Sequence, residues 1–491
     1  MSYLLSLLSG ILTGLSMPGN LFSFLVFFSL IFYLKNMADS KKTYERFLHT
    51  IIYSFSMLFT TFWWQIPVLT KNIPQVLNGY SSFIGFIGFI GMILLLVLPY
   101  LLIWLLSEMY HNRKYRKENY WSLVLFYSFA YTAAEGLKTI GDFAFTGGSL
   151  GYALYDHIGI LQIASIFGYL GISFIIVFIN SLIAFDKSRN WIIKIPIILS
   201  MIYVVNFSIE RFLPMFNDEN SFKVTAIQMN VPQNIKYNSN KWNSYMMFSD
   251  ILKETQEFDT DLVILPESAF LEDIRDTDIN LALKVNISSV NKPVIMGYPR
   301  MSLDKNYNTA WLYDSEGNIS DYYDKVKLVP FAEFLPYKFI FDNFNAFNLI
   351  RYYETGKEYN VFDVSNTKIG TQICFETYFP EVSNELTKNG AQFLLSITND
   401  GWFDNNTALK QHFSQIIFRA VENRKEFLQV SNTGLTGKVD KYGRITDLYK
   451  PHEEKMDNFE VFKNDDITIY IKIRNILKII LFILALLFAI I

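Results

Sequence analysis

Long apolar runs dominate the first 214 residues of the chain. A helix of ~20 apolar residues is long enough to cross a bilayer. Seven runs near this length lie within residues 1–214, and an eighth lies at the C-terminal end. The predicted spans are Tyr3–Met17, Leu21–Leu34, Ile51–Leu69, Phe83–Leu106, Trp121–Ile140, Ile158–Phe185, Trp191–Leu213 and Ile476–Ile491. The pattern therefore predicts a membrane bundle of eight helical spans.

The pattern changes between Phe222 and about Phe462. Short β-prone runs alternate there with amphipathic segments, which is typical of an α/β layered domain. Strands are expected within residues 222–231, 261–268, 293–300, 308–314, 369–376, 393–400 and 427–434. Helices are expected around Ser244–Glu257, Phe379–Leu386 and Ala408–Lys425. We therefore predict three parts: a seven-span bundle (1–214), an extramembrane domain (221–464) and a C-terminal span (470–491).

Composition supports a membrane protein that uses no metal. Hydrophobic residues make up 51% of the chain and charged residues 18%, whereas a soluble domain carries about 25% charged residues. The net charge of −3, with no basic arm, argues against a nucleic-acid partner. The single cysteine excludes an internal disulfide, and the five histidines show no metal-ligand spacing. We expect neither a metal ion nor another cofactor.

Basic residues in the short loops predict the orientation of the bundle. Ten of them follow the second, fourth and sixth runs: Lys35, Lys41, Lys42, Arg46, Arg113, Lys114, Arg116, Lys117, Lys187 and Arg189. The opposite loops hold little beyond Lys71 and Lys138. Because basic loops stay in the cytoplasm, we expect a cytoplasmic N-terminus and an extramembrane domain on the outer side. Against this, a basic group of Lys472, Arg474 and Lys478 lies at the outer end of the eighth run.

The lone cysteine lies in KIGTQICFETYFP, residues 368–380. A short β-prone run precedes Cys374 and a predicted helix follows it. A thiol at such a strand-to-helix turn projects from the backbone, and the first N–H groups of the helix favour negative charge there. The alternative is a buried core cysteine, because free cysteine is among the most buried residue types. Other polar residues of the domain favour a nucleophilic role for Cys374 over a buried structural one.

Two further polar residues suit catalysis by a thiol. Glu267 ends the apolar strand DLVILPE, and Lys325 lies in YDKVKLVPFAEF. A carboxylate can take the proton of a thiol, and an ammonium can stabilise the oxyanion of a tetrahedral intermediate. Each residue also has an ordinary interpretation as a solvated surface charge. Together with Cys374 they form a candidate acyl-transfer site that needs no histidine.

The order and surroundings of these three residues resemble the carbon–nitrogen hydrolase (nitrilase) superfamily. The motifs are LPES, YDKVKLVPFAEF and ICFE, with SITNDGWF, QHF, RAVENR and SNTGLTG further along. These later motifs, the spans and the stretch EGLKTIGDFAFTGGSLGY (135–152) resemble one membrane branch, the apolipoprotein N-acyltransferases. The resemblance implies an α-β-β-α sandwich for the extramembrane domain.

The resemblance also implies roles for individual residues. Glu267 matches the general base of the family, Lys325 the oxyanion stabiliser and Cys374 the nucleophile. Two supporting carboxylates and three residues of the substrate region also match; they are Glu333 and Glu376, and Trp402, Asn308 and Tyr237. Tyr237 stands where the family often has Trp. Ala332 and Asp404 replace common glycines, which bears on loop conformation rather than on reacting groups.

The function implied by the family is transfer of a fatty acyl group. A phospholipid would acylate Cys374 as a thioester, and the amine of a diacylglyceryl-cysteine on an apolipoprotein would then accept the acyl group. The enzyme would be a monomer in the bacterial inner membrane with its catalytic domain in the periplasm. Its partners would be the phospholipid, the apolipoprotein and membrane lipid. A membrane-tethered amidase using water is the alternative enzyme. A transporter is disfavoured because few ionisable residues lie in the spans.

Two other segments carry open alternatives. Residues 337–353 are crowded with aromatic side chains, which suits either a core helix or a lid that admits acyl chains. Glu135 and Lys138 stand three residues apart near the end of a predicted span. Ionisable groups in a span indicate function, although this pair can also neutralise itself.

Overall fold

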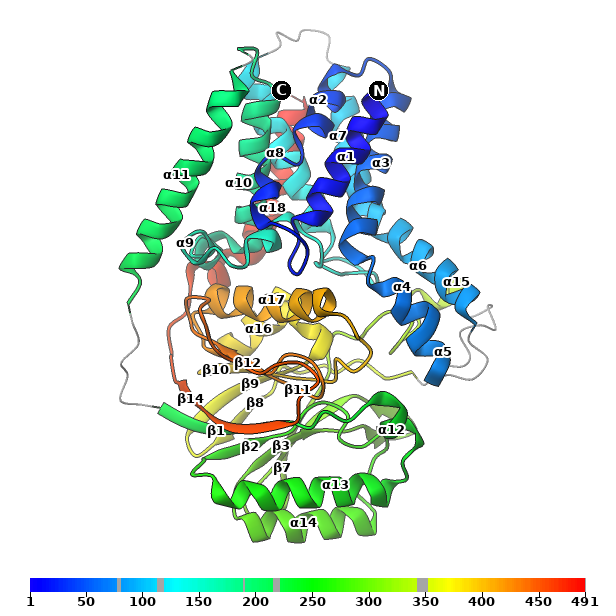
Figure 1. Ribbon diagram of the computed structural model, residues 1–491, viewed down its shortest axis with the longest axis vertical. Coiled ribbons are helices and arrows are strands. Elements are labelled where there is room, and N and C mark those ends of the chain that lie inside the picture. The colour runs from blue at the N-terminus through cyan, green and yellow to red at the C-terminus, as the bar shows by residue number, and fades with distance from the viewer. Residues whose placement is uncertain (77–80, 113–118, 189, 215–220, 342–351, 491) are drawn as a thin grey trace. The chain divides into compact units, whose positions relative to one another are not determined.

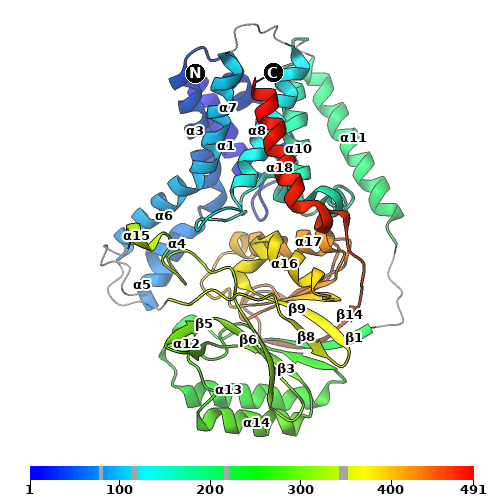
Figure 2. The ribbon, with the colours of Figure 1, turned by 180° about the vertical axis from the view of Figure 1, so that it is seen from behind.

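The computed structural model describes residues 1–76, 81–112, 119–188, 190–214, 221–341 and 352–490 (Figures 1 and 2). The chain forms two compact units. The helical unit comprises Met1–Pro74, Gly79–Pro214 and Thr468–Ile491, and the α/β unit comprises Gln75–Asn78 and Met215–Ile467. The aromatic segment 337–353 is only partly described: α15 (Lys338–Phe341) begins it, Phe339 is 80% exposed, and residues 342–351 lie outside the described residues.

The helical unit contains four helices that are long and apolar enough to cross a membrane in the described part of the chain. These are Ser82–His111, Ala164–Ala184, Ile193–Phe212 and Ile469–Ile490. The elements in chain order are α1 (Ser2–Leu15), η1 (Ser23–Phe27), α2 (Ile31–Asp39), α3 (Thr43–Phe62), α4 (Gln65–Pro67), η2 (Val68–Asn72), α5 (Ile73–Val76), α6 (Ser82–Val97), η3 (Leu98–Tyr100), α7 (Leu101–His111), α8 (Tyr120–Leu137), η4 (Leu150–Leu154), α9 (Ile158–Leu161), α10 (Ala164–Ala184), α11 (Trp191–Phe212) and α18 (Ile469–Ile490).

The predicted span Leu21–Leu34 is not one continuous helix. It is divided into η1 and α2, so its backbone groups between the two elements need other partners. Asn180 on α10 supplies them: its Oδ1 accepts from Leu30 N at 3.0 Å, and its Nδ2 donates to Val26 O at 2.8 Å. In an apolar environment an unpaired backbone group costs several kcal/mol. One buried amide therefore makes this break possible.

The predicted span Ile158–Phe185 is also interrupted. α9 and α10 share it, and Gly168 within α10 has φ 64°. A Cβ at this position would lie 2.4 Å from the ring of Tyr470 on α18. Gly168 therefore provides both the left-handed backbone and the close approach of a neighbouring helix.

The last helix begins earlier than its apolar run indicates. α18 starts at Ile469 rather than near Ile476, so the basic residues that disagreed with the predicted orientation lie within it. Arg474 is buried, and Lys478 donates to Thr139 at 2.9 Å in the same unit. Arg474 is therefore an interior group rather than a loop charge of the kind that sets membrane orientation, and Lys478 is half-buried.

The α/β unit is built on two six-stranded sheets. One has the order β14-β1-β2-β3-β6-β7 and the other β13-β12-β11-β10-β9-β8; β4 and β5 form a separate hairpin. The strands are β1 (Ser221–Gln228), β2 (Leu262–Ile264), β3 (Val294–Gly297), β4 (Arg300–Ser302), β5 (Lys305–Tyr307), β6 (Thr309–Tyr313), β7 (Ile319–Asp324), β8 (Val361–Val364), β9 (Thr367–Ile373), β10 (Phe393–Thr398), β11 (Phe427–Ser431), β12 (Gly437–Val439), β13 (Ile445–Leu448) and β14 (Lys455–Phe462).

Helices cover the outer faces of the two sheets, which completes the expected α-β-β-α order (Figure 1). α13 (Lys241–Glu254) and α14 (Asp278–Val290) pack on the first sheet through a core that includes Leu252, Leu283 and Val263. α16 (Pro380–Lys388) and α17 (Asn406–Asn423) pack on the second sheet. All six residues of β10 are buried, as expected for a strand covered on both faces.

The sequence pattern missed β4, β5, β7, β8, β12, β13 and β14, of which β12 is fully buried. β7, β13 and β14 carry many exposed residues, and all four residues of β13 are exposed. β13 and β14 are edge strands paired antiparallel to a neighbour, so water covers much of their surface. Their hydrophobic signal is weak for that reason.

The sheet topology brings strand ends together. β1, β2 and β3 are parallel, as are β9, β10 and β11. Carboxyl ends of parallel strands meet at one edge of a sheet, which is where α/β proteins place their ligands. Glu267 follows β2, Cys374 follows β9 and Asn399 follows β10.

Replacing Asn180 with Leu tests the interruption between η1 and α2. The variant removes one acceptor and one donor from Leu30 N and Val26 O. We expect a loss of roughly 2–4 kcal/mol in unfolding free energy, since two buried backbone groups become unpaired. Thermal unfolding in detergent micelles measures the loss. Ser188→Leu, which changes an exposed side chain, serves as control, and an equal shift in both variants would contradict the assigned role.

Candidate active site

A buried ammonium lies at the centre of the candidate site. Lys325 follows β7, and its side chain is 1% exposed. Its Nζ lies 2.9 Å from Glu333 Oε1 and 3.8 Å from Glu267 Oε1. Burial alone would lower the pKa of Lys325, but the two carboxylates overcome this and raise it. The side chain is therefore a permanent cation held between two acids.

Glu267 is fixed by hydrogen bonds to both oxygens. Asn308 Nδ2 donates to Oε1 at 2.8 Å, and the backbone N–H of Asn399 donates to Oε2 at 3.1 Å. Asn308 Nδ2 also donates to Glu333 at 2.9 Å, so one amide joins both carboxylates. A Cβ at Gly297 would lie 2.8 Å from Glu267 Cα, which leaves no room there for a side chain. The carboxylate that the sequence placed at a strand end is thus part of a buried network.

Cys374 occupies the turn at the end of β9. Its φ is 51°, in the left-handed region that non-glycine residues adopt rarely, and its side chain is half-buried. Burial and the charge of Glu267 raise the pKa of the thiol well above its usual range, while Lys325 opposes them. The resting thiol is therefore protonated, and its reaction as a nucleophile needs a base.

Glu376 ties the lysine loop to the cysteine turn. Its Oε1 accepts from Val326 N at 2.7 Å, Lys327 N at 3.1 Å and Tyr323 OH at 2.9 Å. Its Oε2 accepts from Ile373 N at 2.8 Å. Burial raises the pKa of Glu376 to about 7, against the lowering effect of these backbone bonds. The carboxylate therefore joins the ends of β7 and β9, which belong to different sheets.

The aromatic residues implied by the resemblance lie together beside Glu267. The rings of Tyr237 and Trp402 are 5.7 Å apart, and Tyr237 is 44% exposed. Burial, and then the charge of Glu267, raises the pKa of Tyr237. Asp404, one of the two departures from the family pattern, has a side chain that is 87% exposed. The other departure, Ala332, is also outside the hydrogen-bonded network described above.

Asp400 and His412 are two members of the site that the sequence analysis did not assign. His412 Nδ1 lies 2.7 Å from Asp400 Oδ1, and His412 Nε2 lies 3.1 Å from the carbonyl oxygen of Cys374. A carboxylate and a carbonyl only accept hydrogen bonds, so both ring nitrogens carry protons. Burial would lower the pKa of His412, but Asp400 raises it. In the sequence, Asp400 and His412 lie in NDGWF and QHF, two motifs that resemble the family but give neither residue a role.

This arrangement also bears on metal binding. Donor atoms of Cys374, Asp400 and His412 all lie within 4.8 Å of one another. A metal ligand must present a free lone pair, whereas both nitrogens of His412 face acceptors. The geometry is that of an ion pair that holds the cysteine backbone, and it does not favour a metal centre.

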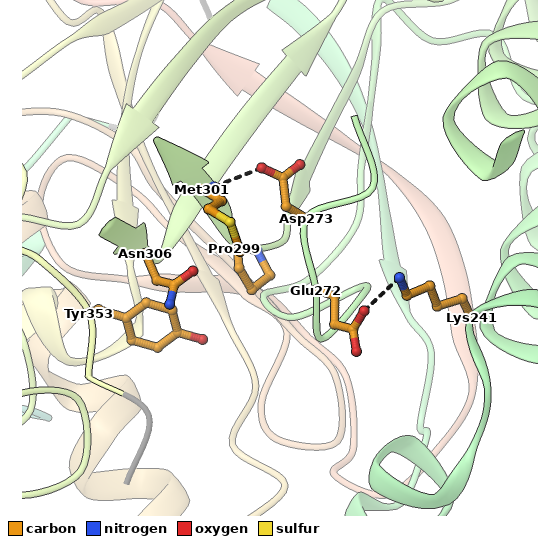
Figure 3. Close-up of a pocket in the computed structure, with 7 residues that line it drawn as sticks. All are labelled: Lys241, Glu272, Asp273, Pro299, Met301, Asn306 and Tyr353. Carbon is orange, nitrogen blue, oxygen red and sulfur yellow. Dashed lines mark hydrogen bonds and ion pairs between the residues drawn. The ribbon is translucent and has the colours of Figure 1, made fainter. Parts of the chain in front are cut away.

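A pocket of about 260 Å³ lies beside the loop that carries Glu333 (Figure 3). Its lining residues are Lys241, Glu272, Asp273, Pro299, Met301, Asn306 and Tyr353. The backbone N–H of Tyr353 donates to Glu333 O at 2.7 Å. None of Glu267, Lys325 and Cys374 lines this pocket, so it adjoins the candidate site without containing the reacting groups.

The ion pair of Asp400 and His412 predicts a pH-dependent stability. The pKa of His412 is raised on folding, so its contribution is present below its unfolded value of 6.5 and is lost as pH rises through the folded value. Asp400→Asn should lower the unfolding free energy by about 3–5 kcal/mol at pH 6. The difference from the native protein should shrink by pH 10.

Thermal unfolding at the two pH values measures this effect. Asp404→Asn, which changes an exposed carboxylate, is the matched control. A loss that is the same at both pH values would show that the charge of His412 is not involved.

Comparison with known proteins places the chain in a family. Residues 9–182 match the apolipoprotein N-acyltransferase N-terminal domain, and residues 223–446 match the carbon-nitrogen hydrolase domain. An apolipoprotein N-acyltransferase of Thermotoga maritima is 38% identical over 473 residues, covering 96% of this chain and 90% of that protein. One from Geobacter metallireducens is 27% identical and covers 94% of this chain and 89% of that protein.

Two solved structures are similar to about half of this chain. The nitrilase-superfamily protein Nit3 of Saccharomyces cerevisiae is 18% identical and covers 49% of this chain and 90% of its own, with a TM-score of 0.39. An amidase from Nesterenkonia sp. is 15% identical and covers 53% of this chain and 95% of its own, with a TM-score of 0.40. The match to the Thermotoga maritima protein extends over nearly the whole of both chains. The chain therefore belongs to the apolipoprotein N-acyltransferase family.

Proposed function

We propose that the protein transfers a fatty acyl group from a phospholipid to the N-terminal amine of a diacylglyceryl-cysteine on an apolipoprotein. The observation that carries the proposal is the network around Lys325, which joins Glu267, Glu333 and Asn308. It supplies a base and a cation beside a protonated thiol. Family membership supports the acyl acceptor, since the relatives are named for it.

The first step acylates Cys374. Glu267 takes the thiol proton as sulfur attacks the carbonyl carbon of a phospholipid ester, and Lys325 stabilises the negative oxygen of the tetrahedral intermediate. The carbon–oxygen ester bond then breaks. The leaving alcohol receives the proton from Glu267 and departs as a lysophospholipid. The raised pKa of Cys374 supports this order, because a protonated thiol requires a base at the moment of attack.

The second step releases the acyl group to the amine. The neutral amine of the acceptor attacks the thioester carbonyl, Lys325 again stabilises the oxyanion, and Glu267 accepts the proton lost by nitrogen. The carbon–sulfur bond breaks and Cys374 regains its proton. The products are an amide and the resting enzyme, so atoms and charges balance across the two steps.

The helical unit supports a substrate drawn from the membrane. We propose that it forms eight spans and places the α/β unit on the periplasmic side of the inner membrane, where both lipids are available. The basic residues that follow the second, fourth and sixth apolar runs support this orientation. Arg46, one of them, is buried in α3 and paired with Glu108, so it is not a loop charge. The buried position of Arg474 likewise removes one charge from the group that disagreed with the orientation.

A mass measurement tests the reaction class and the nucleophile together. After incubation with phospholipid alone, the peptide containing Cys374 should gain the mass of one acyl group, and Cys374→Ala should gain none. Glu267→Gln and Lys325→Met should slow acylation by about 100-fold or more, because each removes a group used in the transition state. Addition of a diacylated lipopeptide should discharge the acyl group as an amide.

The same experiment separates the acyltransferase from an amidase. Release of free fatty acid with no acylated lipopeptide would show that water is the acceptor and overturn the proposal. Acylation of the protein at another residue, with Cys374→Ala still active, would overturn the assignment of the nucleophile. Lys253→Met, which alters an exposed charge, controls for general effects of removing a lysine.

Labelling with a membrane-impermeant thiol reagent tests the orientation. In a Cys374→Ala background, a new cysteine at Ser188 should react only after the inner membrane is opened. One at exposed Leu303 should react in cells whose outer membrane alone is permeable. The charge of the loops predicts these opposite responses, and the reverse pattern would place the α/β unit in the cytoplasm.

A further inference from the structure

A second buried lysine lies close to the proposed base and has no anionic partner in the described part of the chain. Lys236 belongs to α12 (Gln233–Asn238) and is 9% exposed. Its Nζ donates to Asn399 Oδ1 at 3.2 Å, and no carboxylate of the described residues lies within ion-pair distance of it. Buried lysines are almost always paired, because an unpaired buried charge is costly. By contrast, Lys325 in the same site is paired with two carboxylates, those of Glu267 and Glu333.

An unused donor lies on the same short helix. Gln233 is 8% exposed, and its Nε2 has no hydrogen-bond partner among the described residues. Its Oε1 accepts from Asn399 Nδ2 at 3.4 Å, and its side chain packs against Gly401. The side-chain amide of Asn399 is therefore hydrogen-bonded to Lys236 through its oxygen and to Gln233 through its nitrogen. Most buried polar groups in folded proteins are hydrogen-bonded, so the unpaired Nε2 of Gln233 is a donor that a ligand can use.

This pair of donors lies next to the reacting groups. The backbone N–H of Asn399 donates to Glu267 Oε2 at 3.1 Å, so the amide between the two donors belongs to the residue that holds the base. Tyr237 follows Lys236 in the chain, and its ring lies 5.7 Å from that of Trp402. The two donors and the aromatic pair thus come from the same two segments, residues 233–237 and 399–402.

An ammonium beside an amide N–H is suited to a phosphate group. Charge-assisted hydrogen bonds from lysine to phosphate oxygens are strong, and neutral N–H groups complete such sites. In the proposed reaction the acyl donor carries a phosphodiester only a few bonds from its esters, whereas the diacylglyceryl-cysteine acceptor has none. A phosphate site beside Glu267 would therefore recognise one of the two lipids and not the other.

We propose that Lys236 and Gln233 bind the phosphate of the phospholipid donor and so direct its ester toward Cys374. This inference rests on the proposed function, since it assigns the donor of that reaction. Burial lowers the pKa of Lys236 to about 8, against the opposing effect of Glu267. A bound phosphate would supply the missing counter-charge and stabilise the ammonium. When the phosphate leaves with the lysophospholipid, the acceptor lipid would bind through other contacts.

The contacts also allow a simpler role, which the test must separate. In that role Lys236 would position Asn399, whose backbone N–H donates to Glu267, and loss of Lys236 would disturb the base indirectly. An indirect effect would slow acylation by every donor. Loss of a phosphate site would slow acylation only by donors that carry phosphate.

The experiment compares two donors with identical ester groups, dihexanoyl-phosphatidylglycerol and dihexanoylglycerol. Acylation of Cys374 is followed by intact mass in single turnovers of the full-length protein in detergent. Lys236→Met should lower the second-order rate constant for acylation by the phospholipid by on the order of 10- to 100-fold, as expected for a lost charged hydrogen bond. With dihexanoylglycerol the rate should stay within about twofold of the native rate.

Two further variants sharpen the comparison. Lys236→Arg keeps a cation and should restore most of the rate with the phospholipid, and Gln233→Leu should lower that rate alone by roughly 3- to 10-fold. Lys253→Met, which changes an exposed lysine of α13, should leave both rates unchanged.

Equal losses with both donors, or no loss with either, would overturn the phosphate site. The outcome is separable from failure of the proposed function, because that failure would appear in the native protein as no acylation of Cys374 by either donor. The reaction of dihexanoylglycerol also shows that each variant is folded and that its base and nucleophile are intact.

Discussion

The candidate site depends on the neutralisation of one buried charge. Lys325 is enclosed at the end of β7, and an unpaired ammonium there would cost several kcal/mol. Glu333 and Glu267 supply the opposite charge, and Asn308 donates to both of them. Loss of either carboxylate would leave the ammonium under-neutralised. The same contacts that keep Lys325 charged, as its proposed role requires, therefore hold the ends of several strands in place.

Cys374, the proposed nucleophile, is held by a different set of contacts. Cys374 has a left-handed backbone, a conformation that costs about 1–3 kcal/mol and persists only when its surroundings enforce it. Glu376 holds the preceding residue through Ile373 N, and His412 donates to the carbonyl oxygen of Cys374 itself. Since Glu376 also accepts from the loop after Lys325, the two sheets are connected at the site by one carboxylate.

Polar side chains have a comparable structural role in the helical unit. Asn180 satisfies the backbone at the interruption between η1 and α2, and Glu135 Oε1 accepts from the backbone N–H of Leu150 at 2.7 Å. Lys138 Nζ donates to Gly147 O at 2.7 Å. The pair Glu135 and Lys138 therefore fastens the segment that follows α8, which gives these two ionisable residues a structural explanation within their own unit.

The sequence by itself indicated the candidate residues of the site. Glu267 and Cys374 follow short apolar runs, and all three residues, Lys325 included, lie in motifs that resemble the family, so they were recognisable from local sequence. It also indicated the membrane location, although Leu21–Leu34 reads as one span and is in fact η1 and α2. The interruption there depends on Asn180, which lies 150 positions from Leu30 in the chain. A local sequence pattern does not reveal such a distant partner.

Only the tertiary structure decided how the reacting groups are supported. His412 and Asp400 come from α17 and the end of β10, and their roles exist only because the fold brings them to the carbonyl oxygen of Cys374. That Lys236 has no carboxylate partner among the described residues is likewise not visible in the sequence, which does not show neighbours in space. Hydrophobic periodicity depends on neighbours a few positions away, whereas hydrogen bonding and charge neutralisation depend on neighbours in space.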